Sequence, residues 1–381
     1  MPPSDVTPSS MTLDEADRRF MAMALALGER GLGQVWPNPS VGCVLVRDGV
    51  VVGRGWTQPP PGPHGEIEAL GRAGGLALGA TAYVTLEPCC HYGRTPPCTM
   101  ALIHAGLRRV VVAATDPFPR VDGRGVEQLR QAGVRVDVGL MREEAEAQHA
   151  GFFTKVRENR PLVTLKLATS LDGKLATASG ESQWITGAEA RMRGHQLRAN
   201  HDAIMIGANT ARMDDPELTC RLPGMADQSP VRVVVSREGR LPLTSRLAKT
   251  AKDRPTWMMV ASGMPAEAFL AHEEAGIEVI RVGQDPEDER LDITLTLGAL
   301  AERGVTRLLV EGGAKLAASL LQAKLVDRLV WFQAPVLLGG DGQPAIAALS
   351  RHRLADAPVF ERIATEMLAP DLGAAYITRK P

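Results

Sequence analysis

Residues 86–98 read LEPCCHYGRTPPC and hold three of the chain's five cysteines. The run TAYVTL before this stretch has the composition of a buried strand, and TMALIHAG after it has the length of a short helix. The pattern therefore predicts that a strand leads to Cys89, that a proline-rich loop follows, and that Cys98 stands where the next helix starts. The three cysteines could form a disulfide, bind a metal, or lie together by chance.

The rest of the chain argues against a disulfide. Its first 19 residues, MPPSDVTPSSMTLDEADRR, lack the basic-then-apolar order of a secretory signal. The longest apolar runs fall far short of the roughly 18 residues that a membrane helix needs. We therefore expect a cytoplasmic protein that does not bind membranes, and in a reducing cytosol clustered cysteines more often hold metal or react than pair.

Charge and composition indicate a small-molecule ligand. The formal net charge is -1, from 43 Lys and Arg against 44 Asp and Glu, and aromatic residues make up only 4% of the chain. A nucleic-acid partner usually requires a basic face and stacking rings, so we expect none. We also expect a homo-oligomer, although no residue pattern fixes the number of copies.

The length of 381 residues predicts two domains at about 150 residues per domain. Strands and helices alternate along both halves, which is typical of layered α/β domains. A long polar helix over residues 142–159 separates the halves, and Arg160-Pro161 follows it. We therefore predict domains over residues 1–157 and 158–381.

Individual elements follow from periodicity and from turn residues. Thr12-Leu13-Asp14-Glu15 has the form of a capping box, and a helix is expected after it with Phe20, Met23, Ala24 and Leu27 on its apolar face. Two β-branched runs around Asp48-Gly49 predict a hairpin. Further helices are expected at 65–74, 99–106, 125–133, 190–200, 266–276 and after Gly313, and strands at 81–86, 108–115, 134–139, 161–173, 202–208, 231–236, 256–262, 277–282 and 306–311.

A metal site can be composed from the first half alone. His64-Gly65-Glu66 opens a predicted helix after the turn PPPGP. Residues two apart do not face each other along a regular helix, so His64 and Glu66 converge only if His64 lies in its irregular N-terminal end. One imidazole and the thiolates of Cys89 and Cys98 would fill three of the four positions of zinc and leave one for water. Glu66 would then be free to handle the proton of that water, which favours a catalytic zinc over a structural one.

Other cysteines and histidines have simpler interpretations. Cys43 and Cys220 are expected to be small core residues, and Cys90 to pack in its loop beside Cys89 without binding metal. His91 and His104 are expected to be ordinary histidines with satisfied hydrogen bonds.

The histidine, glutamate and cysteine pattern resembles that of zinc nucleobase deaminases, although Cys98 stands nine positions after Cys89 instead of three. The wider loop, with residues 38–44 (NPSVGCV) and 93–98 (GRTPPC), resembles the bifunctional riboflavin-biosynthesis deaminase/reductase family. Residues 166–173, 180–186, 207–210, 214–216, 218–219 and 311–313 resemble the reductase half of that family. The resemblance spans roughly residues 12–345, with weaker signal in 225–300.

This resemblance implies a cytidine-deaminase-like α/β/α domain followed by a dihydrofolate-reductase-like α/β domain. It implies zinc held by His64, Cys89 and Cys98, with Glu66 as the catalytic proton carrier. It further implies NADPH contacts at Ala168, Trp184, Thr210, Asp214, Ser236 and the turn Gly313, Ala314, Lys315, Leu316, Ala317, Ala318 and Ser319. Substrate contacts are implied at Asn38, Ser182, Arg198, Leu218, Arg221 and Glu311.

The implied activity has two steps on one phosphorylated pyrimidine. The first domain would deaminate 2,5-diamino-6-(5-phosphoribosylamino)pyrimidin-4(3H)-one at C2, and the second would reduce the opened ribosyl chain with NADPH. Arg198 and Arg221 suit a substrate phosphate because a guanidinium group can donate two parallel hydrogen bonds to it. Backbone N–H groups after Gly312-Gly313 suit a cofactor phosphate.

Alternatives stay open at this level. The chain could be a nucleobase deaminase of single activity with an inert second domain, or a binding protein with a structural zinc. Lys166 and Asp172 could orient substrate or form a structural pair at a strand end, and Asp214 could transfer a proton or simply belong to a turn. Two positions depart from the family pattern: Gly65 stands where alanine is usual, which should loosen the helix start, and Phe118 replaces a usual asparagine.

Overall fold

The computed structural model describes residues 15–93, 96–286 and 289–379. Thr12, Leu13 and Asp14 of the predicted capping box, and Arg94 and Thr95 of the cysteine loop, lie outside this part of the chain. Within it, no helix is long and apolar enough to cross a membrane.

The chain folds as two compact units that divide between Ala150 and Gly151. This point lies inside helix α5 (Arg142–Glu158), whereas the sequence predicted a boundary after residue 157. Gly151 explains the earlier division, because a Cβ built on it would lie 2.5 Å from Arg307 Cγ and 2.8 Å from the Thr306 carbonyl oxygen. The second half of α5 is therefore part of the second unit. Residues Leu32–Pro37 also belong to the second unit.

The first unit is built on a five-stranded sheet of order β2-β1-β3-β4-β5. Its strands are β1 (Gly42–Arg47), β2 (Val50–Trp56), β3 (Thr81–Leu86), β4 (Arg109–Ala114) and β5 (Arg135–Val138). The β1–β2 pair is the predicted hairpin, with Asp48 and Gly49 both at positive φ as a tight turn requires. β3, β4 and β5 run parallel, so their carboxyl ends lie at the same edge.

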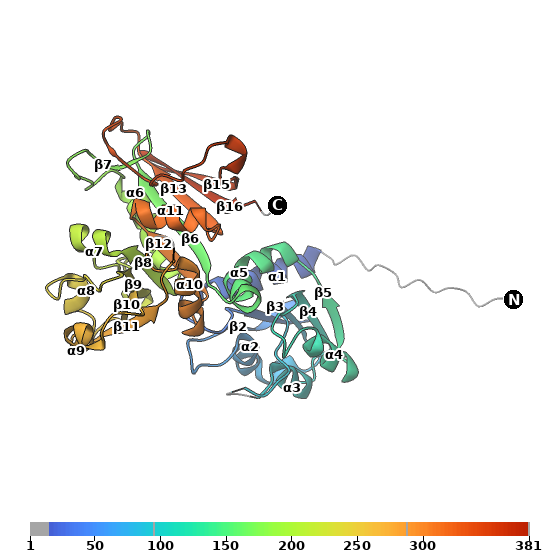
Figure 1. The fold of residues 1–381 in the computed structure, drawn as a ribbon. Helices are drawn as coiled ribbons and strands as arrows, with labels where there is room; N and C mark the ends of the chain where they lie inside the picture. The colour runs from blue at the N-terminus through green and yellow to red at the C-terminus, as the bar shows by residue number, and fades with distance from the viewer. Residues whose placement is uncertain (1–14, 94–95, 287–288, 380–381) are drawn as a thin grey trace. The chain divides into compact units, whose positions relative to one another are not determined.

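Helices cover both faces of this sheet, in three layers (Figure 1). α1 (Glu15–Glu29) and α5 lie on one side; α2 (Gly65–Ala73), α3 (Cys98–His104) and α4 (Arg124–Gln131) lie on the other, with a 3-10 turn η1 (Gly74–Ala77) after α2. In α1, Phe20, Ala24 and Leu27 are buried as predicted, but Met23 is exposed. Met21 takes its place in the core with no exposed surface.

The second unit contains a nine-stranded sheet of order β11-β10-β9-β8-β12-β6-β13-β16-β15. Its strands are β6 (Leu162–Thr169), β8 (Ala203–Gly207), β9 (Val231–Val235), β10 (Thr256–Ala261), β11 (Ile277–Val282), β12 (Arg307–Glu311), β13 (Arg328–Gln333), β15 (Phe360–Leu368) and β16 (Asp371–Thr378). The strands from β11 to β13 are parallel, and β16 and β15 continue the sheet antiparallel. Short strands β7 (Lys174–Ala176) and β14 (Gln343–Pro344) pair separately.

Helices complete the second unit. They are α6 (Ala188–Ala199), α7 (Ala208–Asp214), α8 (Arg246–Lys249), α9 (Leu270–Glu274), α10 (Ile293–Glu302) and α11 (Ala314–Gln322), with 3-10 turns η2 (Ala226–Gln228), η3 (Ala266–Phe269) and η4 (Leu354–Asp356). The helix predicted over 266–276 is in fact η3 followed by the single turn of α9. Alternate residues of the strands supply two apolar cores, with Val233 in one and Val234 in the other. Both faces of the parallel part of the sheet are thus buried, which explains its unbroken apolar runs.

Candidate functional site

His64 and Glu66 converge because His64 is not part of helix α2. It is the N-cap residue, with extended dihedrals of φ -71° and ψ 160°, and the helix starts at Gly65. Its imidazole is therefore free to turn toward the cysteine loop. The condition set by the sequence analysis, an irregular start to this helix, is met.

The side chains of His64, Cys89 and Cys98 form a three-point cluster. His64 Nδ1 lies 3.7 Å from Cys89 Sγ and 3.3 Å from Cys98 Sγ, and the three atoms lie within 4.8 Å of one another. Tetrahedral zinc with ordinary Zn–S and Zn–N bonds separates its ligand atoms by about 3.5 to 3.8 Å. The donor set and its spacing fit zinc, with a fourth position left over.

The two thiols differ in their surroundings. Hydrogen bonding from Cys98 lowers the pKa of the Cys89 thiol, whereas the same contact and burial raise the pKa of Cys98. Cys98 is the first residue of α3, and its N–H donates to Cys89 Sγ at 3.3 Å. A bound cation would favour the thiolate form of both. Cys90 turns away from the cluster, and its Sγ contacts the Arg120 carbonyl instead.

Glu66 lies behind the cluster and is only 3% exposed. Its Oε2 is buried and has no hydrogen-bond partner among the described residues. Burial raises the pKa of this carboxyl group, and the nearby His64 opposes the rise. A buried, unpaired carboxylate oxygen is costly unless a ligand completes it, which is typical of a proton-transfer group.

Glu87, which directly precedes Pro88 and Cys89, is a second buried carboxylate. Its two oxygens accept four backbone N–H groups, from Asp116, Gly123, Gly125 and Val126, at 2.9 to 3.2 Å. It thereby fixes the loop after β4 and the start of α4 beside the strand end that carries Cys89. An acidic residue directly before Pro-Cys was the only available signal for this role.

Gly65 has a packing function that the sequence analysis did not foresee. A Cβ at this position would lie 2.6 Å from the Val41 carbonyl oxygen and 3.1 Å from Trp56 Cα. Glycine therefore lets α2 start closer to β1 and β2 than a larger residue would. Asn38, the expected pyrimidine contact, lies half-buried in the loop that leads to β1.

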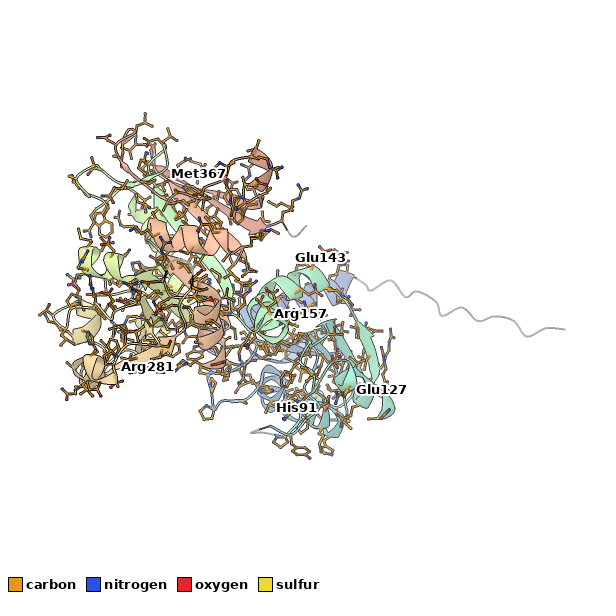
Figure 2. The ribbon with its side chains drawn as sticks, viewed as in Figure 1. His91, Glu127, Glu143, Arg157, Arg281 and Met367 are labelled. Carbon is orange, nitrogen blue, oxygen red and sulfur yellow. The ribbon has the colours of Figure 1, made fainter. Side chains whose placement is uncertain are left out.

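The ring of Phe118 packs against His91 in the loop region around the cluster, with centroids 5.8 Å apart. His91, labelled in Figure 2, follows Cys90 in the cysteine loop. Its Nδ1 is buried and has no hydrogen-bond partner among the described residues, so the expectation of a satisfied histidine stays a prediction. His104 is exposed, and Cys43 and Cys220 are buried, as expected.

In the second unit, the residues expected to bind cofactor gather where parallel strands end. Ala168 lies near the end of β6, Ser236 directly follows β9, Thr210 and Asp214 belong to α7 after β8, and Gly313 follows β12. These four strands have their carboxyl ends at one edge, the usual position of ligand sites in such sheets. Thr210 links two of the loops, because a Cβ on Gly313 would lie 3.3 Å from its Oγ1.

The glycine turn before α11 provides a cradle of backbone N–H groups. Gly312 and Gly313 have φ of 76° and 86°, and Gly313 is the N-cap of α11. The helix itself starts at Ala314, so the N–H groups of its first turn point outward without partners in the helix. Ala317 already donates to the Gly313 carbonyl at 3.0 Å, and the side chains of Ala317 and Ala318 are buried in the core. The N–H groups at the start of the predicted 313–319 segment are therefore the ones best placed for a cofactor phosphate.

The substrate residues expected in this unit include a buried ion pair. Arg198 donates to both oxygens of Glu311, at 2.7 and 2.8 Å, and its Nη1 donates to the Thr219 carbonyl at 3.0 Å. Lys166 Nζ lies 3.9 Å from Glu311 Oε2, and burial lowers the pKa of this lysine. Asp172 instead accepts hydrogen bonds from Ser170 and from the N–H groups of Leu338 and Gly339. Of the two alternatives for Lys166 and Asp172, the structural pair is not formed, because each side chain contacts other groups.

The remaining predicted positions of the second unit do not belong to the Arg198–Glu311 ion pair. Arg221 is half-exposed and pairs with Glu217 at 3.5 Å, while Leu218 is buried, with a positive φ of 56°. Trp184 is 65% exposed beneath the Arg191 guanidinium, and Ser182 precedes it by two residues. Burial raises the pKa of Asp214, and the left-handed Asp215 that ends α7 matches the turn interpretation.

Comparison with known proteins identifies both halves. The sequence model of the RibD C-terminal domain matches residues 161–358, and that of the cytidine and deoxycytidylate deaminase zinc-binding region matches residues 14–114. The riboflavin biosynthesis protein RibD of Escherichia coli strain K12 is 41% identical over 372 residues, covering 93% of this chain and 98% of that protein. The chain belongs to the RibD family. The RibD of Aquifex aeolicus is 42% identical over 325 residues, covering 85% of this chain and 88% of its own.

Solved structures of RibD proteins share the whole fold. Acinetobacter baumannii RibD, form 1, superposes with a TM-score of 0.86 at 36% identity, covering 96% of this chain and 99% of its own. A diaminohydroxyphosphoribosylaminopyrimidine deaminase/5-amino-6-(5-phosphoribosylamino)uracil reductase from Thermotoga maritima gives 0.82 at 33% identity, covering 96% and 99%. The predicted fold class is confirmed. As a RibD the chain is a bifunctional deaminase and reductase of riboflavin biosynthesis that uses zinc and NADPH.

Proposed function

We propose that the chain performs the two RibD reactions with the residues assembled above, deamination in the first unit and reduction in the second. The observation that carries the proposal is the cluster of His64, Cys89 and Cys98 with the buried Oε2 of Glu66 beside it, which has no hydrogen-bond partner among the described residues. A structural zinc site has no use for such a carboxylate, which argues against the binding-protein alternative.

In the deaminase unit, His64, Cys89 and Cys98 would hold the zinc. The ion, when bound, would lower the pKa of a water molecule and so supply the nucleophile that attacks C2 of the pyrimidine. Glu66 takes one proton of that water at Oε2 and delivers it to the ring nitrogen, and it then carries the second proton, from the new C2 hydroxyl, to the departing amino group. The C2 amino group leaves as ammonia and a C2 oxygen replaces it, so one water is consumed. The raised pKa of Glu66 suits a group that must both accept and release a proton.

Asn38 is proposed to position the pyrimidine through amide hydrogen bonds. Phe118, which replaces the family's usual asparagine, packs against His91 and is proposed to form an aromatic wall of this pocket. Contacts with the pyrimidine in this region are therefore expected to be apolar on that side.

In the reductase unit, the substrate residues would be Ser182, Arg198, Leu218, Arg221 and Glu311. The paired arms of Arg198 are already bonded to Glu311, so Arg221 is the more available partner for the substrate phosphate. NADPH would supply hydride to C1' of the opened ribosyl chain, and a proton completes the ribityl product. The protein aligns the two reactants and excludes water.

The cofactor fits the edge formed by β6, β8, β9 and β12. Ala168, Trp184, Thr210, Asp214 and Ser236 are the proposed contacts, together with the segment from Gly313 to Ser319. The positive φ of Gly312 and Gly313 supports a phosphate against the start of α11, because a side chain there would obstruct the N–H groups.

The enzyme is further proposed to be a cytoplasmic homo-oligomer that takes a small phosphorylated pyrimidine. All five cysteines are free thiols, which suits a reducing compartment. The edge strand β15 supports oligomerisation, since Val359 just before it and Ile363 and Met367 within it are 56%, 55% and 73% exposed. Met367 is labelled on this strand in Figure 2.

A coupled assay tests the proposal. The purified protein is given the diaminopyrimidine ribosyl phosphate and NADPH, and ammonia and NADPH absorbance are followed together, with and without a zinc chelator. We expect ammonia to appear first and NADPH oxidation to follow. Chelation should abolish both signals, and deaminated intermediate supplied to the chelated protein should restore NADPH oxidation alone. If NADPH is not oxidised even with that intermediate, the second unit is inert and the single-activity alternative holds. If chelation unfolds the first unit, the zinc is structural.

A further inference from the structure

The buried carboxylate of Asp371 links the first residue of β16 to the start of α6. Its Oδ2 accepts the N–H of Gly187 at 2.6 Å, across 184 positions of the chain. Asp371 is only 1% exposed, and its Oδ1 is buried with no hydrogen-bond partner among the described residues. It lies beyond residue 358, where the match to the RibD C-terminal domain ends. A buried carboxylate oxygen without a partner costs stability, which favours a role for Asp371 beyond packing.

Gly187 allows the close approach between these two elements. A Cβ at this position would lie 3.0 Å from Pro370 Cδ and 3.3 Å from Asp371 Oδ2. Gly187 is also the N-cap of α6, and no side chain caps this helix. The carboxylate thus stands at the positive end of a 12-residue helix. The hydrogen bond and the missing Cβ together fix the start of α6 against β16.

Residues 180–187, which we call the strap, end at this contact. The strap carries Ser182, a proposed substrate contact, and Trp184, a proposed cofactor contact. Gly180 begins it with φ of 93°. In its middle the Ile185 N–H donates to the Ser182 carbonyl at 3.2 Å, which is a local turn. The contact at the end of the strap is therefore the one that ties it to a distant strand.

A cavity of about 380 Å³ lies beside the strap. Residues 184–188 line it from the strap and the start of α6, and residues 334–336 line it after β13. Arg191 holds the strap from above, with its guanidinium 4.9 Å from the Trp184 ring centroid and its Nη1 donating to the Thr186 carbonyl at 2.6 Å. Because the strap borders a cavity instead of a close-packed core, its position depends on such polar contacts.

We propose that Asp371 is a positioning residue of the reductase site, which holds the strap where Ser182 and Trp184 meet substrate and cofactor. The inference rests on the proposed reductase function. Asp371 acts on the reaction through the Gly187 N–H, and a hydrogen bond to a carboxylate is among the stronger contacts that a loop can make. Without it the strap occupies its binding position for only a fraction of the time. The apparent affinity for both reactants then falls by that fraction.

Steady-state kinetics on the full chain test the proposal, with deaminated intermediate and NADPH as the reactants. Asp371→Ala should raise KM for both reactants about tenfold, because it removes a charge-assisted hydrogen bond. The kcat should fall less than about threefold, since saturating reactants draw the strap into place. Asp371→Asn should bring KM back to within about threefold of the unaltered protein, because its amide oxygen can accept the same N–H.

Glu189→Gln is the matched control. Glu189 is an exposed acidic residue in the first turn of the same helix, so its loss removes a carboxylate near the helix start and leaves the bond to Gly187 intact. KM for both reactants should stay within about twofold, as expected for an exposed charge. A KM rise in this variant equal to that of Asp371→Ala would mean that only the charge at the helix start matters, and it would overturn the inference.

Gly187→Ala tests the same contact from the other side, since its Cβ would press on Pro370 and Asp371. It should raise KM as Asp371→Ala does, and it decides the question alone if Asp371→Ala does not fold. A purely structural role would instead lower kcat at unchanged KM, in proportion to the folded fraction.

The outcomes separate this inference from the proposed function. Unchanged KM in Asp371→Ala and Gly187→Ala overturns the inference while the reductase assignment stands. Equal KM in Asp371→Asn and Asp371→Ala also overturns it, because the hydrogen bond would then not be the cause. If the unaltered protein does not oxidise NADPH with the intermediate, the reductase function itself fails.

Discussion

Arg198 on α6 and Glu311 at the end of β12 form a two-armed ion pair, with Nε to Oε1 at 2.7 Å and Nη2 to Oε2 at 2.8 Å. Both side chains are largely buried, at 15% and 11% exposure. Burial alone would raise the pKa of Glu311, but the charge of Arg198 lowers it to about 2. The pair therefore stays charged at any working pH and fixes the helix against the strand end where substrate is proposed to bind.

Glu311→Gln should destabilise the second unit by about 3 kcal/mol, because it leaves Arg198 and Lys166 buried without their carboxylate. The rate at which deaminated substrate is reduced should fall as well, while ammonia release by the first unit continues. Urea unfolding and the two separate assays measure these effects. Glu217→Gln is the control, since Glu217 pairs with Arg221 at the surface and its loss should cost about 0.5 kcal/mol or less. A Glu311→Gln protein as stable as the control would contradict this account.

Glu66→Gln should abolish ammonia release, since an amide cannot carry the proton from water to the leaving group. NADPH oxidation on supplied intermediate should remain, because the substitution lies in the other unit. Glu68→Gln is the matched control two positions along the same helix, where the carboxylate only pairs with Arg72 near the surface. Loss of both activities in Glu66→Gln would contradict independent sites.

The zinc content of serine variants should distinguish the three cysteines of residues 86–98. Cys89→Ser and Cys98→Ser should each lose bound zinc, because a serine hydroxyl is a poor replacement for a thiolate ligand. Cys90→Ser should retain it, since the Cys90 sulfur faces the Arg120 carbonyl. Elemental analysis of the purified proteins measures the ratio of zinc to chain. Equal loss in all three variants would mean that the cluster is not the site.

His201 should make the second unit sensitive to acid. It is buried, with Nδ1 at 2.6 Å from the Leu197 carbonyl and Nε2 at 2.9 Å from Thr164 Oγ1, and burial lowers its pKa from 6.5 to about 3. Below pH 6.5 the unfolded chain binds a proton that the folded chain does not, so stability falls as the pH drops from 6.5 toward 3. The loss is at most about 1.4 kcal/mol per pH unit.

His201→Gln removes this contribution while offering similar hydrogen bonds. Between about pH 7.5 and about pH 5, the stability difference between the unaltered protein and the variant should shrink by about 2 kcal/mol. Urea unfolding at the two pH values measures it, with the exposed His352→Gln as control. A difference that does not change with pH would show that His201 does not titrate in this window.

Much of the fold was predictable because its signals are local. The apolar runs of β3, β4, β8, β9 and β12 are each bounded by turn residues, and Asp48-Gly49 specifies its hairpin with two residues. The strands β13, β15 and β16 were not predicted. β15 is exposed along almost its whole length, so its sequence lacks the apolar pattern of a buried strand.

The sequence by itself predicted the cluster of His64, Cys89 and Cys98 with Glu66 nearby, because His64 and Glu66 are joined by one residue and the two cysteines flank a single loop. Only the tertiary structure decided which charges pair across the second unit. β12 lies beside β6 in the register that sets Glu311 opposite Lys166, and α6 brings Arg198 to the same carboxylate from 113 residues away. The same holds for the four N–H groups on Glu87 and for the close approach that requires Gly65. Such choices depend on sheet register and helix placement, which are fixed by burial over the whole domain and by no short stretch of sequence.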